Sequence, residues 1–186
     1  ILISHPHAAT YDNGAAAGLA HAKMLATYAP GVAAAEHSRM GLSLRALAQL
    51  RPVVANRLLH GIGAHRLAAH PGIEMFARAG ASAASRCGMQ TKAYDWVFLA
   101  HDAAVAMGRW PRALDALYAY EDGALHSFQR ARRAGLQCIW DLPLPHWRSI
   151  QTLFEDESKR WPDAAGAVPI EPAWKRMRKE QELGIA

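Results

Sequence analysis

Histidine and acidic residues follow the short apolar runs of this sequence, where they could bind a ligand or move a proton. Five such runs are followed by Ser4, His5 and His7, by Glu36 and His37, by His101 and Asp102, by Glu121 and Asp122, and by Asp141. In an open parallel sheet the carboxyl ends of the strands lie along one edge, and ligands bind in the crevice there. Loop residues are often polar for solvation alone. The concentration of imidazoles and carboxylates nevertheless favours one shared site.

The elements that would position these residues are short apolar runs alternating with longer helical stretches, a pattern typical of a parallel α/β sheet. We expect strands at residues 1–4, 32–35, 96–100, 117–120 and 136–140, of which 96–100 is the clearest. Helices are expected at 14–28, in two or three pieces over 42–80, and at 123–134, 146–160 and 173–183. The predicted fold class is therefore α/β, a parallel sheet with helices on both faces, and 186 residues fit one domain.

Two loop motifs near the N-terminus carry specific chemical possibilities. His5 and His7 flank one proline and could be metal ligands, as in metal-dependent hydrolases, because neutral imidazole binds zinc and manganese. Further ligands would then come from His37, His101, Asp102 or Asp141. The alternative use of both imidazoles is hydrogen bonding to hydroxyls and phosphate. Asn13 and Gly14 are expected at a turn and helix start, whose free amides suit phosphate or sugar hydroxyls.

Composition and missing motifs exclude several classes of protein. Lys and Arg total 21 against 16 Asp and Glu, so anionic partners are allowed. Zinc-finger spacing and an aromatic-basic RNA signature are lacking, so no nucleic-acid partner is expected. P-loop, dinucleotide and Gly-x-Ser-x-Gly motifs are also lacking. The two cysteines lie far apart and the first residues form no targeting peptide, which favours a cytoplasmic location. No uncharged apolar run reaches the length of a membrane span.

Four segments carry a family resemblance, in order along nearly the whole chain. They are Ile1–His7 with Asn13-Gly14, Asp95–His101, Tyr118–Leu125, and Asp141-Leu142-Pro143 with His146-Trp147. Together they resemble the N-terminal domain of a bacterial family 4 (group 1) glycosyltransferase of the GT-B fold. The third and fourth segments, Tyr-Ala-Tyr-Glu-Asp-Gly-Ala-Leu and Asp-Leu-Pro with His-Trp, are the most distinctive.

The resemblance implies a reaction and roles for individual residues. GT-B enzymes have two Rossmann-like halves, of which the N-terminal half receives the acceptor and the C-terminal half holds the nucleotide-diphosphate sugar. Transfer in this family retains anomeric configuration and needs no metal or cofactor, the nucleotide-sugar being a co-substrate. By this resemblance His101 is the catalytic candidate and contacts the transferred sugar. The substrate-binding candidates are His5, His7, Asn13 and Gly14 at the donor phosphates and acceptor, Glu121 and Asp122 at the acceptor or hinge, and Asp102 and Asp141 at their strand ends.

The resemblance also sets expectations for the chain's context. The family's C-terminal domain carries two glutamates eight positions apart, and no pair here has that spacing. We therefore expect residues 1–186 to be one acceptor-side domain that stops before its last strand and the donor domain, and to transfer no sugar alone. The acceptor would be a glycan, a lipid or another glycoconjugate of the cell surface. The basic segment 175–179 is either a solvated face or a contact with anionic lipid at the inner face of the membrane.

Two further functions stay open on the residues alone. One is the metal-dependent hydrolase that uses His5 and His7, and the other is a binding domain without chemistry of its own. Tryptophans leave a similar choice, because Trp147 and Trp161 could stack on a sugar ring or pack against the sheet. Trp96 and Trp140 lie in apolar runs and are expected in the core.

Overall fold

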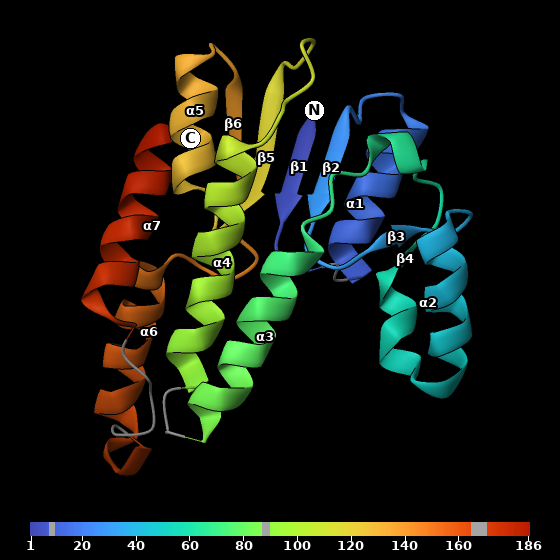
Figure 1. Cartoon of the computed structure of the whole chain (residues 1–186). Coiled ribbons are helices and arrows are strands. Elements are labelled where there is room, and N and C mark those ends of the chain that lie inside the picture. The colour runs from blue at the N-terminus through green and yellow to red at the C-terminus, as the bar shows by residue number, and fades with distance from the viewer. Residues whose placement is uncertain (8–9, 87–89, 165–170) are drawn as a thin grey trace.

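A four-stranded parallel sheet in the order β2-β1-β5-β6 forms the centre of the molecule (Figure 1). The computed structural model describes residues 1–7, 10–86, 90–164 and 171–186. The strands are β1 (Leu2–His5), β2 (Thr27–Pro30), β5 (Ala116–Tyr120) and β6 (Gln137–Asp141). A separate parallel pair consists of β3 (Ala34–Ala35) and β4 (Leu58–Leu59). The predicted α/β fold class is thus confirmed.

Helices cover both faces of this sheet (Figure 1). Those before β5 are α1 (Thr10–His21), α2 (Arg39–Leu50), α3 (Pro71–Ser85) and α4 (Gln90–Met107). Those after β5 are α5 (Leu125–Arg133), α6 (Trp147–Arg160) and α7 (Ala173–Ile185). Helices α4 and α5 pack side by side, and α7 packs against α5. The helices α5, α6 and α7 and the strands β5 and β6 agree with the sequence prediction to within about two residues.

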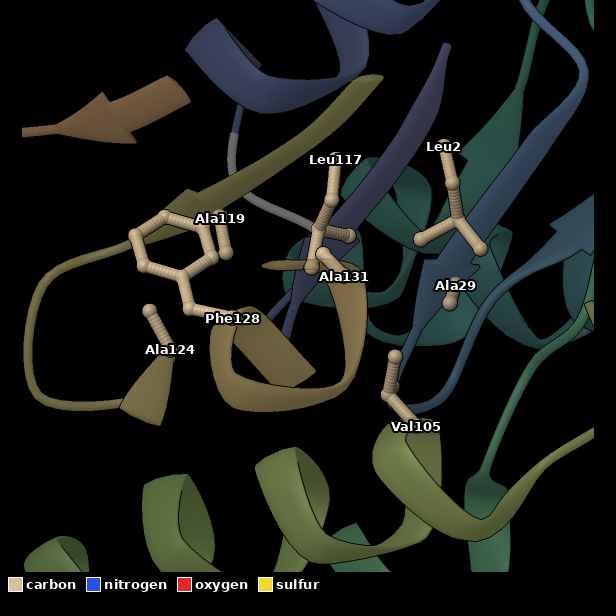
Figure 2. Packing of buried hydrophobic residues seen from close by; sticks show 8 residues of the cluster. All are labelled: Leu2, Ala29, Val105, Leu117, Ala119, Ala124, Phe128 and Ala131. Atoms are coloured by element: carbon tan, nitrogen blue, oxygen red, sulfur yellow. The ribbon is translucent and has the colours of Figure 1, made fainter. Parts of the chain in front are cut away.

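Alternation along the strands divides the core into two halves. On one face, Leu2 and Leu117 of neighbouring strands meet Val105 of α4 and Phe128 of α5, as Figure 2 shows. On the other face, Ile3 and Tyr28 pack with α1. Successive strand residues point to opposite faces, so one register places both sets correctly. The sheet is therefore buried on both sides, as parallel sheets usually are.

The segment 96–100 is a helix, and the prediction of a strand there was wrong. Val97, His101 and Val105 of α4 are all 1–2% exposed. Their spacing of four places them on one face of a helix, whereas a strand would bury every second residue. Trp96, expected in the core, is 64% exposed on the opposite face. The strand-favouring residue types of this run are thus overridden by its helical burial pattern.

Three elements near the N-terminus also differ from expectation. Helix α1 begins at Thr10 and ends at His21, so Asn13 and Gly14 lie within it rather than at its start. The second strand of the central sheet is 27–30, which overlaps the last two residues of the stretch predicted as helix 14–28. The predicted strand at 32–35 is reduced to the two-residue β3, which pairs with β4.

Candidate functional site

The carboxyl edge of the sheet brings together three of the residues proposed from sequence. His5 ends β1, Glu121 directly follows β5, and Asp141 ends β6. The strands are adjacent in the order β1-β5-β6, and the Glu121 amide donates to the Asp141 carbonyl at 3.0 Å. The expected convergence of strand ends is confirmed for these three positions.

His5 is held in an aromatic cluster at this edge. The residue is 4% exposed, and its ring lies 4.6 Å from the Tyr120 ring and 6.4 Å from the Phe98 ring, edge to face in both cases. The His7 ring meets Phe98 at 5.4 Å. The His7 amide donates to His5 Nδ1 at 3.1 Å, which fixes the loop after β1. This cluster orients His7, whose side chain is 25% exposed, toward Glu74.

A buried glutamate that the sequence analysis did not single out lies beside this loop. Glu74 is 1% exposed and accepts from Arg57 Nη2 at 2.6 Å and from Arg78 Nε at 2.8 Å. The Val32 amide also donates to it, and His7 Nδ1 lies 3.7 Å from Oε1. Burial alone would raise the pKa of Glu74, but the His7 ring, the amide and the two guanidiniums outweigh it and lower the pKa to about 2. Glu74 is therefore ionised and ties α3 to the loops after β1 and β2.

Gly31 makes this arrangement possible. A Cβ at that position would collide with the carbonyl oxygen of Pro6 and with the Glu74 carboxylate. The loop after β2 therefore approaches both groups more closely than any side chain would allow.

His101, the catalytic candidate of the sequence analysis, lies inside α4 and not after a strand. It is 1% exposed, and its Nε2 hydrogen-bonds the Ala29 carbonyl oxygen at 3.0 Å. Its ring meets that of His70 at 5.5 Å. Burial, with the nearby His70 and His5, lowers the pKa of His101 to about 3, so the ring is neutral at pH 7. The expectation for its role rested on a strand exit that does not exist.

Asp102, proposed as substrate-binding, joins α4 to α5 and α7. Its Oδ1 accepts from the Ser127 amide and hydroxyl at 2.9 and 2.7 Å, at the start of α5. Its Oδ2 accepts from the His126 amide at 2.8 Å and from Arg178 Nη2 of α7 at 2.7 Å. A carboxylate placed at a helix N-terminus stabilises the free amides there. These donors enclose Asp102, which is fully buried.

Asn13, Gly14 and Asp141 differ in their surroundings. Asn13 accepts from the Tyr28 hydroxyl at 3.1 Å and donates to the Asn56 carbonyl at 2.9 Å. Gly14 is exposed, with no atom within 4 Å of an added Cβ. Asp141 accepts from the Tyr118 hydroxyl at 2.7 Å. Asn13 and Asp141 thus serve the protein's own loops and strands.

A network of ion pairs joins the β5 exit to α7. Lys179 lies 2.7 Å from Glu121 and 2.8 Å from Glu171, and Lys175 lies 3.0 Å from Asp122. Burial raises the pKa of Glu121, although the ion pair with Lys179 acts in the opposite direction. Burial alone would lower the pKa of Lys179, but Glu121 and Glu171 outweigh it and raise that pKa. Asp122 has a φ of 66°, a left-handed turn that aspartate tolerates. The basic segment 175–179 therefore turns Lys175, Arg178 and Lys179 inward instead of presenting a wholly solvated face.

Glu182 of α7 completes the closure of this turn. It is fully buried and accepts from the amides of Asp122, Ala124 and Leu125 at 3.0–3.2 Å. The indole of Trp140 also donates to it, at 3.1 Å. Burial raises the pKa of Glu182 to about 7 against the effect of these donors. The loop that carries Glu121 and Asp122 is thus fixed from α7.

A cavity of about 630 Å³ opens beside Glu121, between α6 and α7. Its apolar wall consists of Leu144, Pro145, Trp147, Ile150 and Phe154. Its polar lining consists of Glu121, Gln151, Glu155, Ser158, Lys159, Glu171, Arg176 and Lys179. The Trp147 indole donates to Glu180 at 2.9 Å, and the Arg176 guanidinium lies 5.1 Å from the Trp147 ring. A pocket of this size, mostly apolar with a few polar groups, is typical of a small-molecule site.

Metal and membrane features can be assessed for the described ranges. Within them, no three His, Cys, Asp or Glu side chains form a group that could hold a metal ion. His5 and His7 instead contact their own loop and Glu74. No helix in the part of the chain that the structure describes combines the length and apolar character needed to cross a membrane. Comparisons of the chain with protein-family models, with curated proteins and with solved structures find no match.

Proposed function

We propose that this chain is the acceptor-side domain of a retaining glycosyltransferase. The enzyme would transfer a sugar from a nucleotide-sugar to a glycan, lipid or other glycoconjugate acceptor, which this domain would bind. The observation that carries the proposal is the cavity beside Glu121, at the carboxyl edge of a parallel sheet. Ligands of open α/β sheets bind at this edge. The proposal also draws on the motif Tyr118–Leu125, which supplies β5, the Glu121-Asp122 turn and the start of α5.

The chemistry of the cavity suits a sugar. The ring of Trp147 gives the cavity an apolar surface against which a sugar can pack. The carboxylates of Glu121 and Glu171 can accept hydrogen bonds from sugar hydroxyls, and the Lys179 ammonium can donate to the hydroxyl oxygens. Glu121 is already oriented by Lys179 and by the hydrogen bond from its backbone amide to Asp141 of β6. Little conformational freedom is therefore lost when an acceptor binds.

The loop after β1 is the proposed position of the donor diphosphate. Arg57 and Arg78 share the single carboxylate of Glu74, which leaves one excess positive charge beside His7. Cations and hydrogen-bond donors stabilise the negative charge of a departing nucleoside diphosphate. His5 and His7 act in this proposal as hydrogen-bonding groups at the loop, whereas His101 and Asp102 are positioning residues that hold α4 and α5 in place.

The proposal is tested by NMR with isotope-labelled protein and a panel of methyl glycosides of glucose, galactose, mannose and N-acetylglucosamine. At least one glycoside should shift the Trp147 indole resonance and the amides of 171–179. In Glu121→Gln the affinity should fall about tenfold or more, the loss expected when a hydrogen bond to a charged group is weakened. Glu157→Gln is the control, because Glu157 lies on α6, outside the cavity lining, and pairs with Arg160. Shifts confined to residues outside the cavity would reject the acceptor assignment.

A further inference from the structure

The cavity lining combines an apolar stripe on α6 with polar residues of α6 and of other elements. Trp147, Ile150 and Phe154 recur at intervals of three and four on α6, so they form one apolar stripe. From Trp147 to Phe154 this stripe runs for about 10 Å, at about 1.5 Å per residue. The polar residues of the lining are Gln151, Glu155, Ser158 and Lys159 on the same helix, and Glu121, Glu171, Arg176 and Lys179 outside it. A molecule that fills the cavity therefore meets both apolar surface and ionic groups.

The apolar stripe of α6 is only partly covered by the described part of the protein. None of the residues 147–160, all of which the structure describes, is buried. The helix is attached near its first turn, where Trp147 and Arg148 contact Glu180 at 2.9 and 2.8 Å. Phe154 remains 37% exposed. An amphipathic helix normally buries its apolar stripe. An apolar group of a ligand bound in the cavity would cover this stripe and be removed from water itself.

The charge of the lining indicates the kind of polar group that would accompany the apolar one. The described lining includes the carboxylates Glu121, Glu155 and Glu171 and the cations Lys159, Arg176 and Lys179. These charges balance, and Lys179 is already paired with two of the carboxylates. An anionic head group would face carboxylates as well as cations. A neutral group with several hydroxyls can donate to the carboxylates and accept from the cations at once.

We infer that the occupant of this cavity is a neutral glycolipid-like amphiphile, with its apolar chain against α6 and its sugar head against Glu121, Glu171 and Lys179. The inference rests on the proposed function in that it takes the cavity as the acceptor site. It narrows the acceptor to a sugar joined to an apolar chain and sets aside free oligosaccharides and anionic lipids. The volume of about 630 Å³ suits one such molecule and is within the range of small-ligand pockets.

The test is titration calorimetry of the whole chain with methyl, hexyl, octyl and decyl β-D-glucosides below their micelle concentrations. Affinity should rise by about two- to fourfold for each methylene that becomes buried. Phe154→Ala should flatten this rise and leave methyl glucoside unchanged, and Ile150→Ala should do the same independently. Leu153→Ala is the matched control, because Leu153 is a neighbouring apolar residue of α6 that is 59% exposed and outside the lining.

Four results would overturn the inference, and they separate it from the proposed function. Affinity that stays flat with chain length, while methyl glucoside still binds in a Glu121-dependent way, removes the amphiphile and keeps the acceptor site. An equal effect of Leu153→Ala and Phe154→Ala moves the chain out of the cavity. Equal affinity for decyl glucoside and for decyl dimethylamine oxide, which lacks a sugar, rejects both the sugar head and the acceptor assignment. Preference for decyl phosphate over decyl glucoside would contradict the neutral head.

Discussion

Replacing Glu74 by Gln should destabilise the protein by about 3 kcal/mol at pH 7, because Glu74 is the single carboxylate that joins α3 to two loops at the sheet edge. The side chain is 1% exposed and pairs with Arg57 and Arg78. Its pKa falls from 4.5 to about 2 on folding. At about 1.4 kcal/mol per pH unit, this difference corresponds to about 3 kcal/mol. Loss of one partner of a buried ion pair is in the same range.

The sign of the pH dependence follows from the lowered pKa. Between pH 4.5 and about 2 the unfolded chain binds a proton at Glu74 that the folded protein does not, so acid favours unfolding. The stabilisation is complete above about pH 5 and declines as the pH falls. At pH 3.5 about 2 kcal/mol of it should remain, and almost none near pH 2. His101, whose lowered pKa has a similar effect in acid, is common to both proteins and cancels in their difference.

The assay is urea unfolding of wild type and Glu74→Gln at pH 7, 5.5, 4.5 and 3.5, followed by circular dichroism. Glu157→Gln is the control, because Glu157 makes an exposed pair with Arg160 and should change the free energy of unfolding by less than about 1 kcal/mol. A Glu74→Gln variant as stable as wild type at pH 7 would refute the reasoning. So would a difference between the two proteins that does not change from pH 7 to pH 3.5.

Two further substitutions test the packing of the site. Glu182→Ala should lower the free energy of unfolding by about 3–5 kcal/mol, because it leaves the amides of Asp122, Ala124 and Leu125 without their buried acceptor. Thermal unfolding measures this loss. The control is Gln181→Ala at the exposed neighbouring residue, which should stay within about 0.5 kcal/mol of wild type. Equal losses of stability for the two variants would contradict the role of Glu182 in fixing the loop that carries Glu121 and Asp122. Gly31→Ala should destabilise by several kcal/mol through collision with Pro6 and Glu74, whereas Gly14→Ala, with open space on a helix, should be neutral or stabilising by up to about 1 kcal/mol. A well-folded Gly31→Ala protein of normal stability would show that the close approach is not required.

Local signals were sufficient for the C-terminal half of the fold. In β5 and β6 short apolar runs are bounded by polar residues and followed by Gly or Pro, and the positive φ of Gly135 marks the end of α5. Segment 96–100 misled because aromatic and β-branched residues favour strands, while tertiary packing selected its helical period. The spacing of Val97, His101 and Val105 by four residues fits that period and was present in the sequence.

The candidate site was predictable at the strand ends and unpredictable across helices. His5, Glu121 and Asp141 could be placed because the carboxyl ends of parallel strands share one edge. Glu74 and Arg57 lie in different elements 17 positions apart, so no local pattern joins them. Arg178 and Lys179 belong to a basic segment of the sequence, but α7 places Arg178 against Asp102 and Lys179 against Glu121. Only the i,i+4 spacing of Glu74 and Arg78 gave a hint of the buried cluster.

The most direct test of the acceptor-side assignment is calorimetric titration of wild type and Glu121→Gln with the methyl glycoside that shifts the Trp147 indole. Circular dichroism of both proteins confirms that the substitution leaves the fold intact. The proposal predicts saturable binding to the wild type and an affinity about tenfold or more lower for Glu121→Gln, with Glu157→Gln equal to the wild type. Equal binding by wild type and Glu121→Gln, or no binding of any glycoside of the panel at millimolar concentration, would contradict it.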